Sequence, residues 1–229
     1  MHPDDIESWC AGTAATLAAR GARVAYLVLT SGDKGSPDPL ADPREIAAVR
    51  EAEQLAAATL LGVDEVTFLR YPDGEVSDSP ELRHRIAAVI RRVRPDLLLT
   101  FDPWQPYAFH RDHREGSAAA LAAAYPLARR PGPWRGPADE RGPHAVRAAW
   151  LFLTDRPDRF VDIGPTFEAK VVARVAHASQ TGDPASLAAA YRERAATTGA
   201  RVGLALAEAF HEVTFPAPGQ EWLNAVLGA

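Results

Sequence analysis

Hydrophobic and polar positions alternate along the chain in a way that predicts helices and strands in turn. Apolar residues recur at helical spacing over residues 6–20, and Gly21 stands where a helix C-cap belongs. A mainly apolar run over residues 23–29 then predicts a strand. The same alternation continues with helices over residues 42–61 and 80–93, and with strands over residues 65–69 and 96–101. Strands that alternate with helices predict an α/β fold, with a mostly parallel sheet flanked by helices.

The second half of the chain continues this pattern up to a short tail. It predicts a helix over residues 113–124 and strands over residues 146–153 and 159–163. Helices are then predicted over residues 166–176 and 184–210. A break is expected near Gly199 in the last helix. Residues 126–143, dense in Pro, Gly and Arg, predict an excursion or lid rather than a linker, because too little chain flanks them to make two cores. We therefore expect one domain over residues 1–229.

Composition and charge narrow the class of protein. The 229 residues are 47% hydrophobic, which is enough to bury one sizeable core. A net charge of −5 does not favour binding to nucleic acid or to an anionic membrane. No apolar run is long enough to span a bilayer. Because Cys10 is the only cysteine, an intrachain disulfide is excluded, and a small buried side chain is the expected role. These features predict a cytoplasmic protein.

Two short clusters carry the candidate chemistry, His2-Pro3-Asp4-Asp5 and His110-Arg111-Asp112-His113. Imidazoles beside carboxylates are ligands for a divalent metal, and a catalytic site takes about three protein ligands and leaves a position for water. Adjacent carboxylates cannot both point at one metal in ordinary geometry, so one is spare to act as a base. In the second cluster one histidine can bind metal while the other stabilises an oxyanion or protonates a leaving group. By itself, each cluster is more commonly surface or capping chemistry, but both are expected at the ligand edge of one sheet.

Three further features are weaker. The loop over residues 30–36 follows a predicted strand, yet Gly32-x-x-Gly35 matches no phosphate-binding fingerprint, which favours an ordinary turn with a substrate-facing residue or two. Arg50 and Glu53 are three apart on a predicted helix, which is typical of a surface ion pair. For Asp73, turn chemistry is a sufficient explanation on its own, and a functional role stays open at this point.

Together these residues resemble the PIG-L/LmbE family of N-acetylglucosaminyl deacetylases, which includes the deacetylases of mycothiol and bacillithiol synthesis. The resemblance covers nearly the whole chain. It rests on six motifs: His2-Pro3-Asp4-Asp5-Ile6-Glu7, Thr30-Ser31-Gly32-Asp33-Lys34-Gly35, Arg50-x-x-Glu53, Tyr71-x-Asp73-Gly74, His110-x-Asp112-His113 and His177-x-Ser179-Gln180. The first and the fifth are specific in combination, and the others support them.

The resemblance implies a Rossmann-like fold and a role for each candidate residue. It implies zinc bound by His2, Asp5 and His113, although such a set also suits iron, cobalt or manganese. Asp4 would be the general base on the metal-activated water, His110 would stabilise the oxyanion or aid departure of the amine, and Asp112 would orient a histidine. Arg50 and Asp73 would face the sugar. For His177 two roles stay open, a residue at the wall of the site or a helix histidine satisfied by a neighbouring backbone group.

The chain departs from the family pattern in two places. Arg111 occupies a position where relatives usually carry proline, and the place of Tyr107 relative to the family's tyrosine is left open, so Tyr107 is not assigned a catalytic role. The family's first strand, which precedes the His-Pro-Asp-Asp motif, is missing, because only Met1 stands there. Each buried backbone group left unpaired would cost about 1–3 kcal/mol. We therefore expect the natural protein to start upstream of Met1.

The expected activity is removal of an N-acetyl group from a glucosamine-containing small molecule by a metal-dependent amide hydrolase. An alternative is a non-catalytic or impaired sugar-binding homologue whose shortened first motif no longer organises metal. A nucleotide-dependent transferase or dehydrogenase is disfavoured because no glycine-rich fingerprint follows a predicted strand. The expected partner is an N-acetylglucosaminyl conjugate, without nucleic acid or a membrane span. The apolar tail from Pro216 favours docking on the body of the protein or in a homo-oligomer.

Overall fold

A computed structural model describes residues 1–130 and 142–216 of the protein. Its contacts group the chain into two compact units. Unit 1 holds residues 1–76, 110–112 and 159–209, and unit 2 holds residues 77–109, 113–158 and the chain from residue 210 onward. The single domain expected from the sequence stays a prediction.

Unit 1 contains the first two strands and most of the helices. Its elements are α1 (Asp5–Trp9), α2 (Ala11–Ala19), β1 (Ala25–Thr30), α3 (Pro43–Leu60), β2 (Glu65–Tyr71), β5 (Arg159–Asp162), η2 (Gly164–Thr166), α6 (Phe167–Val175), η3 (Ala178–Gln180), α7 (Pro184–Ala200) and the start of β6 (Ala207–Thr214). Strands β1 and β2 pair in parallel, with Ala25 opposite Glu65. The start of β6 is the neighbour of β5.

Local sequence explains where several of these elements begin and end. Asp42 caps α3 by accepting a hydrogen bond from the Arg44 backbone N–H at 2.8 Å, and Pro43 occupies the first helical position. The predicted helix over residues 6–20 is present but divides at Cys10, whose φ of −138° is not helical. Gly21 follows with a φ of 83°, the left-handed conformation that suits glycine after a helix.

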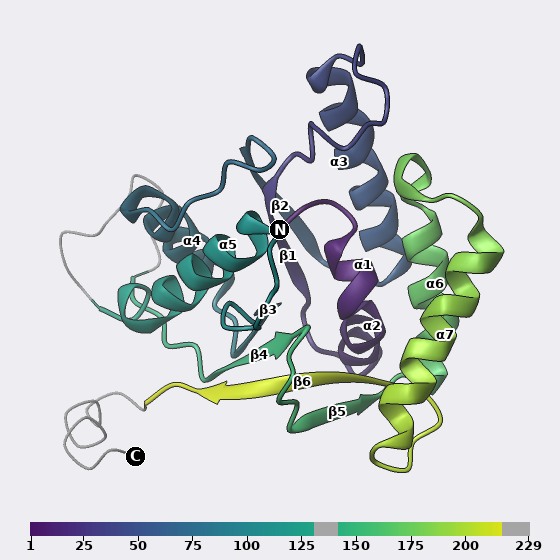
Figure 1. Ribbon diagram of the computed structural model, residues 1–229. Helices are drawn as coiled ribbons and strands as arrows, with labels where there is room; N and C mark the ends of the chain where they lie inside the picture. Colours follow the sequence, from purple (N-terminus) through teal and green to yellow (C-terminus); the bar gives the residue numbers. More distant parts are fainter. Residues whose placement is uncertain (131–141, 217–229) are drawn as a thin grey trace. The chain divides into compact units, whose positions relative to one another are not determined.

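Helix α6 lies at the centre of the helices of unit 1. It contacts α1, α2, α3 and α7, and Figure 1 shows it between α3 and α7. The core beneath it is built largely from small side chains, namely Ala11, Ala14, Ala15, Tyr26, Ala57, Ala58, Leu61 and Ala173. Small residues let these backbones approach closely. This packing holds α1 and the start of the chain against α3 and α6.

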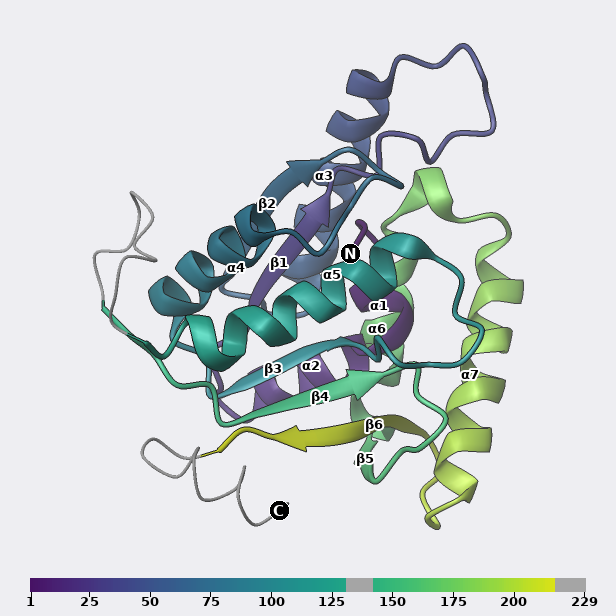
Figure 2. The same ribbon diagram turned by 60° about the vertical axis from the view of Figure 1, so that its left-hand side comes forward.

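Unit 2 contains the remaining elements. They are α4 (Pro80–Val93), β3 (Leu97–Phe101), α5 (Arg111–Ala122) from His113 onward, η1 (Ala123–Leu127), β4 (Ala148–Phe152) and the rest of β6. Strand β3 pairs in parallel with β4, and β4 pairs antiparallel with β6, as Figure 2 shows. The mixed α/β fold with parallel strands flanked by helices is therefore confirmed. Among the described residues, no helix combines the length and the apolar character that a membrane span needs.

The helix expected over residues 184–210 does break near Gly199 as predicted, but the helix expected beyond that break is wrong. Helix α7 ends at Ala200, and residues from Ala207 onward form β6. Gly203 lies between them with a φ of 74°, which does not continue a right-handed helix. Residues 211–214 of β6 instead pair with β4, and the carbonyl of Phe210 accepts a hydrogen bond from the Asp158 N–H at 2.9 Å. These long-range bonds outweigh the helix propensity of the local Ala and Glu residues. The predicted lid, except residues 126–130 and 142–143, and the predicted apolar tail beyond residue 216 lie outside the described residues.

Candidate metal and catalytic site

His2 lies at the centre of a group of carboxylates in unit 1. Its Nδ1 atom is 3.1 Å from Oδ2 of Asp5. Its Nε2 atom is 3.1 Å from Oδ1 of Asp73 and 3.0 Å from Oδ2 of Asp112. The His2 residue is only 6% exposed, so these contacts replace most of the water around its ring.

Asp112 is anchored by backbone hydrogen bonds as well as by His2. Its carboxylate accepts from the N–H of Gly74 at 2.7 Å and from the N–H of Val76 at 3.1 Å. The residue is fully buried. The turn after β2 and the start of α5 therefore meet at this carboxylate, which brings the two predicted clusters together.

The loop after β1 holds the turn that carries Asp73. The Asp33 carboxylate accepts a hydrogen bond from the Asp73 N–H at 2.8 Å, and Lys34 Nζ donates to the Asp73 carbonyl at 2.7 Å. Lys34 also lies 2.7 Å from Oε1 of Glu75. The glycine-containing loop thus contacts Asp73 from two of its residues and fixes the position of the turn.

The carboxylates give this group a strong preference for positive charge. Burial by itself disfavours the protonated ring of His2, but hydrogen bonds with Asp112, Asp5 and Asp73 outweigh it and raise the pKa of His2 to about 10. Hydrogen bonding to His2 in turn lowers the pKa of Asp73. At Asp112, burial raises the pKa but is outweighed by the bonds from His2, Gly74 and Val76, so the pKa is lowered.

This donor set fits a divalent cation. His2, Asp73 and Asp112 each offer a ligand atom, and these atoms lie within 4.8 Å of one another. Imidazole nitrogen and carboxylate oxygen are the ligand types that zinc and similar metals use. The carboxylates that stabilise a proton on His2 are thus also suited to stabilise a metal cation that replaces this proton.

Asp4 stands next to this group in an unusual backbone conformation. Its φ of 98° and ψ of −19° lie in the left-handed region, where a residue other than glycine costs about 1–3 kcal/mol unless its surroundings hold it. Its carboxylate lies between two buried arginines, 3.5 Å from Nη2 of Arg50 and 3.4 Å from Nη2 of Arg174. Burial first, and then the Asp5 charge, raise the pKa of Asp4, although Arg50 and Arg174 oppose them.

The surface ion pair expected for Arg50 is wrong. Arg50 is only 4% exposed, and its guanidinium donates to the carbonyls of Gly32 at 3.1 Å and Pro3 at 2.6 Å. Glu53 instead accepts hydrogen bonds from the backbone and hydroxyl of Ser179. A Cβ at Gly32 or Gly35 would lie 2.3 or 2.4 Å from Nη1 of Arg50, so both glycines make room for this side chain.

The two histidines of the second cluster belong to different units. His110 lies in unit 1, where its ring centroid is 4.6 Å from that of His2. His113 lies in unit 2, where its ring stacks on Phe101 with centroids 3.8 Å apart. Unit 1 thus assembles seven of the predicted site residues, namely His2, Asp4, Asp5, Arg50, Asp73, His110 and Asp112. The ligand set that includes His113 stays a prediction.

Sequence reasoning left Gln54 and Arg174 out of the site and gave Glu7 no role of its own. Oε1 of Gln54 accepts a hydrogen bond from the Asp4 N–H at 3.1 Å, and Nε2 of Gln54 donates to Glu7 at 2.9 Å. His177, fully buried, contacts Glu7 at 3.1 Å rather than a backbone group. The spacing of Gln54, four residues after Arg50 on one helix, was a signal for a shared face.

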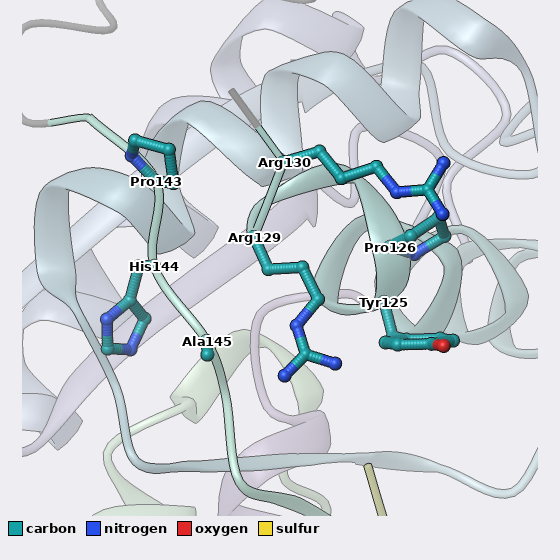
Figure 3. A pocket seen from close by; sticks show the side chains of 7 residues that line it. All are labelled: Tyr125, Pro126, Arg129, Arg130, Pro143, His144 and Ala145. Carbon is teal, nitrogen blue, oxygen red and sulfur yellow. The ribbon is translucent and has the colours of Figure 1, made fainter. Parts of the chain in front are cut away.

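A separate hollow of about 230 Å³ lies in unit 2 and is shown in Figure 3. It is lined by Tyr125, Pro126, Arg129, Arg130, Pro143, His144 and Ala145. The Arg129 guanidinium lies 5.1 Å from the centre of the Tyr125 ring and donates to the Pro216 carbonyl. None of the predicted site residues lines this hollow.

The fold and the carboxylate-rich group around His2 define an α/β protein with a cation-type site, and comparison with known proteins narrows this class. Residues 1–124 match the family described as PIG-L: GlcNAc-PI de-N-acetylase. This match spans more than half of the chain, so the protein belongs to the PIG-L family, and the resemblance seen in the sequence is confirmed.

Individual relatives agree with this family. A diacetylchitobiose deacetylase of Thermococcus kodakarensis is 36% identical over 183 residues, which are 78% of this chain and 67% of that protein. A probable N-acetyl-alpha-D-glucosaminyl L-malate deacetylase 2 of Bacillus anthracis is 36% identical over 130 residues, which are 54% of this chain and 56% of that protein. The solved N,N'-diacetylchitobiose deacetylase from Pyrococcus horikoshii, in complex with its inhibitor MPG, has a TM-score of 0.84 at 28% identity, covering 96% of this chain and 85% of that one. The chain thus spans from about half to two thirds of these two curated relatives' length.

Proposed function

We propose that this protein is a metal-dependent hydrolase that removes an N-acetyl group from a glucosamine-containing small molecule. The observation that carries the proposal is the group of three carboxylates around the buried imidazole of His2, with Asp4 beside it. Membership of the PIG-L family supports it, as do relatives named as deacetylases of diacetylchitobiose and of an N-acetylglucosaminyl malate. The expected partner is therefore an N-acetylglucosaminyl conjugate.

His2, Asp5 and His113 would hold the metal in this proposal, and zinc is the proposed ion. Iron, cobalt and manganese accept the same ligand types, so the ligands alone do not select among these metals. When bound, the metal supplies Lewis-acid polarisation of the amide carbonyl and of the attacking water. In this ligand set Asp112 does not hold the metal, although its donor type would fit. It contacts Nε2 of His2 and would orient the ring, because a partner at the second ring nitrogen fixes the tautomer and the direction of a ligating histidine.

Asp4 would take the proton from the attacking water. Its raised pKa makes it a better base than an ordinary aspartate, while Arg50 and Arg174 hold its carboxylate in place. His110 would donate a hydrogen bond to the oxygen that gains negative charge, or a proton to the departing amine. Asp73 and Arg50 are proposed to face the sugar, with Arg50 acting mainly through its contacts with Pro3 and Asp4.

An acetate-release assay tests the proposed function. The purified protein is stripped of metal, reloaded with zinc, iron, cobalt or manganese, and offered N-acetylglucosaminyl conjugates with sugar, inositol and malate aglycones. Metal-dependent release of one acetate per amine formed is the expected result. Stoichiometric metal without acetate from any conjugate would contradict it and favour the sugar-binding alternative. A cytoplasmic location stays a prediction, which fractionation of the source cells tests.

A further inference from the structure

The backbone of Asp4 is held by contacts on both of its sides. Its N–H donates to Oε1 of Gln54 at 3.1 Å, and its carbonyl accepts from the N–H of Ser8 at 2.9 Å in the first turn of α1. The carbonyl of Pro3, one residue earlier, accepts from Arg50. Of these bonds, only the one to Gln54 fixes the direction of the Asp4 N–H. That direction, together with the left-handed φ, sets where the Asp4 carboxylate points.

The amide of Gln54 has a defined orientation because of its other neighbour. Gln54 and Glu7 are fully buried, and Nε2 of Gln54 lies 2.9 Å from Oε1 of Glu7. An ionised carboxylate only accepts hydrogen bonds, so the NH₂ end of the amide must face Glu7. The oxygen end must then face Asp4, where it accepts the backbone N–H. Glu7 thus selects the end of Gln54 that Asp4 meets.

His177 completes this chain of hydrogen bonds. Its Nε2 atom lies 3.1 Å from Oε2 of Glu7 and must donate, because the carboxylate accepts. His177 is fully buried, and its Nδ1 has no hydrogen-bond partner among the described residues. The ring therefore serves a single polar contact, the one with Glu7.

We infer that Gln54 is a positioning residue for Asp4, and that Glu7 and His177 fix the orientation of the Gln54 amide. The series of hydrogen bonds His177–Glu7–Gln54–Asp4 connects the start of η3, helix α1 and helix α3 to the backbone of the proposed base. None of the first three residues contacts the substrate in this assignment. They act on the reaction by setting the direction of the Asp4 carboxylate. The inference rests on the proposed function, since it takes Asp4 as the base.

Exchanging the two middle residues separates positioning from a general need for buried polar groups. Gln54→Glu places two carboxylates against each other, and their repulsion moves the side chain at position 54 away from Glu7 and from its place at the Asp4 N–H. Glu7→Gln removes the carboxylate that fixes the orientation of the Gln54 amide and accepts from His177. The double variant Gln54→Glu/Glu7→Gln restores every bond. The new carboxylate at position 54 accepts from Asp4 and from the new amide at position 7, whose oxygen accepts from His177.

The kinetic experiment measures kcat and KM for acetate release from an N-acetylglucosaminyl conjugate. The kcat is calculated per folded molecule that carries metal. Gln54→Glu is expected to lower kcat about 100-fold while KM changes less than about threefold, because a misdirected base slows the chemical step rather than binding. The double variant should recover kcat to within about tenfold of the wild type. The control is Glu208→Gln, the same substitution type as Glu7→Gln, in a buried ion pair that is not part of these hydrogen bonds. It should lower the urea midpoint and leave kcat unchanged.

Either of two kinetic results would overturn the inference: an unchanged kcat in Gln54→Glu, or a double variant no better than the single ones. If the wild-type protein releases no acetate at all, the proposed function fails, and crystal structures then decide the positioning separately. In Gln54→Glu the φ of Asp4 should leave the left-handed region, and in the double variant it should return. A φ that stays near 98° in Gln54→Glu would refute the role of Gln54.

Discussion

Nε2 of His2 lies 3.0 Å from Oδ2 of Asp112, although the two residues are 110 positions apart in the sequence. We expect Asp112→Asn to weaken metal binding about 10–100-fold, because the loss of a charged partner leaves the ligating histidine less basic and less well oriented. Titration of the metal-free protein against a competing chelator measures this change. Asp183→Asn is the control, since Asp183 caps the exposed start of α7 and asparagine caps a helix equally well. Equal affinity in Asp112→Asn and wild type would contradict the prediction.

The proposed base and the proposed ligand should separate in their effects. Asp4→Asn keeps the shape of the side chain but cannot accept a proton, so we expect full metal content and a loss of most turnover, at least about 100-fold. His113→Ala removes a ligand and should lose both metal and turnover. Metal analysis and acetate release on the same samples check both expectations. Full activity in Asp4→Asn would refute its role as base.

Gly35→Ala tests whether Arg50 needs the space beside the loop after β1. An added Cβ would lie 2.4 Å from Nη1 of Arg50, so the guanidinium must move away from the Gly32 carbonyl and from Asp4. We expect a loss of about 1–3 kcal/mol in the free energy of unfolding and a lower kcat. Gly182→Ala is the matched control, because nothing lies within 4 Å of a Cβ at that position. Indistinguishable behaviour of the two variants would show that Arg50 adapts without cost.

A buried ion pair connects α6, the start of β6 and the start of α2 in unit 1. Lys170 Nζ lies 2.5 Å from Oε1 of Glu208, whose carboxylate also accepts the backbone N–H groups of Gly12 and Thr13 at the start of α2. We expect Glu208→Ala to lower the free energy of unfolding by about 3–5 kcal/mol, because it leaves Lys170 buried without its partner. Urea unfolding measures the loss. Glu168→Ala, which breaks the exposed pair with Arg192, should cost at most about 1 kcal/mol. Similar losses in both variants would contradict the assignment.

Much of the local structure follows from the sequence alone. Helix α4 spans the predicted residues 80–93, because Ser79 caps it, Pro80 starts it, and Leu82, Ile86 and Ile90 form one buried face. The two histidine-aspartate clusters were recognisable as a cation-type site, and their resemblance to one family was correct. Capping, helical spacing and ligand type are properties of a few neighbouring residues, so a linear pattern is enough to find them.

Only the tertiary structure decided which distant groups meet. The spacing of Arg50 and Glu53 favoured a surface ion pair, the family resemblance placed Arg50 at the sugar, and residues 207–210 were predicted as helix. Arg50 is in fact buried against Pro3 and Gly32. Residues 207–210 belong to strand β6, of which residues 211–214 pair with β4. His177 and Glu7 are 170 positions apart, and no local signal joins them. A buried polar group takes whichever partner the fold brings within reach, because leaving it unpaired costs more than the local preference is worth. Sequence pattern therefore determined the elements and the ligand types, and packing between distant segments decided the network that holds Asp4.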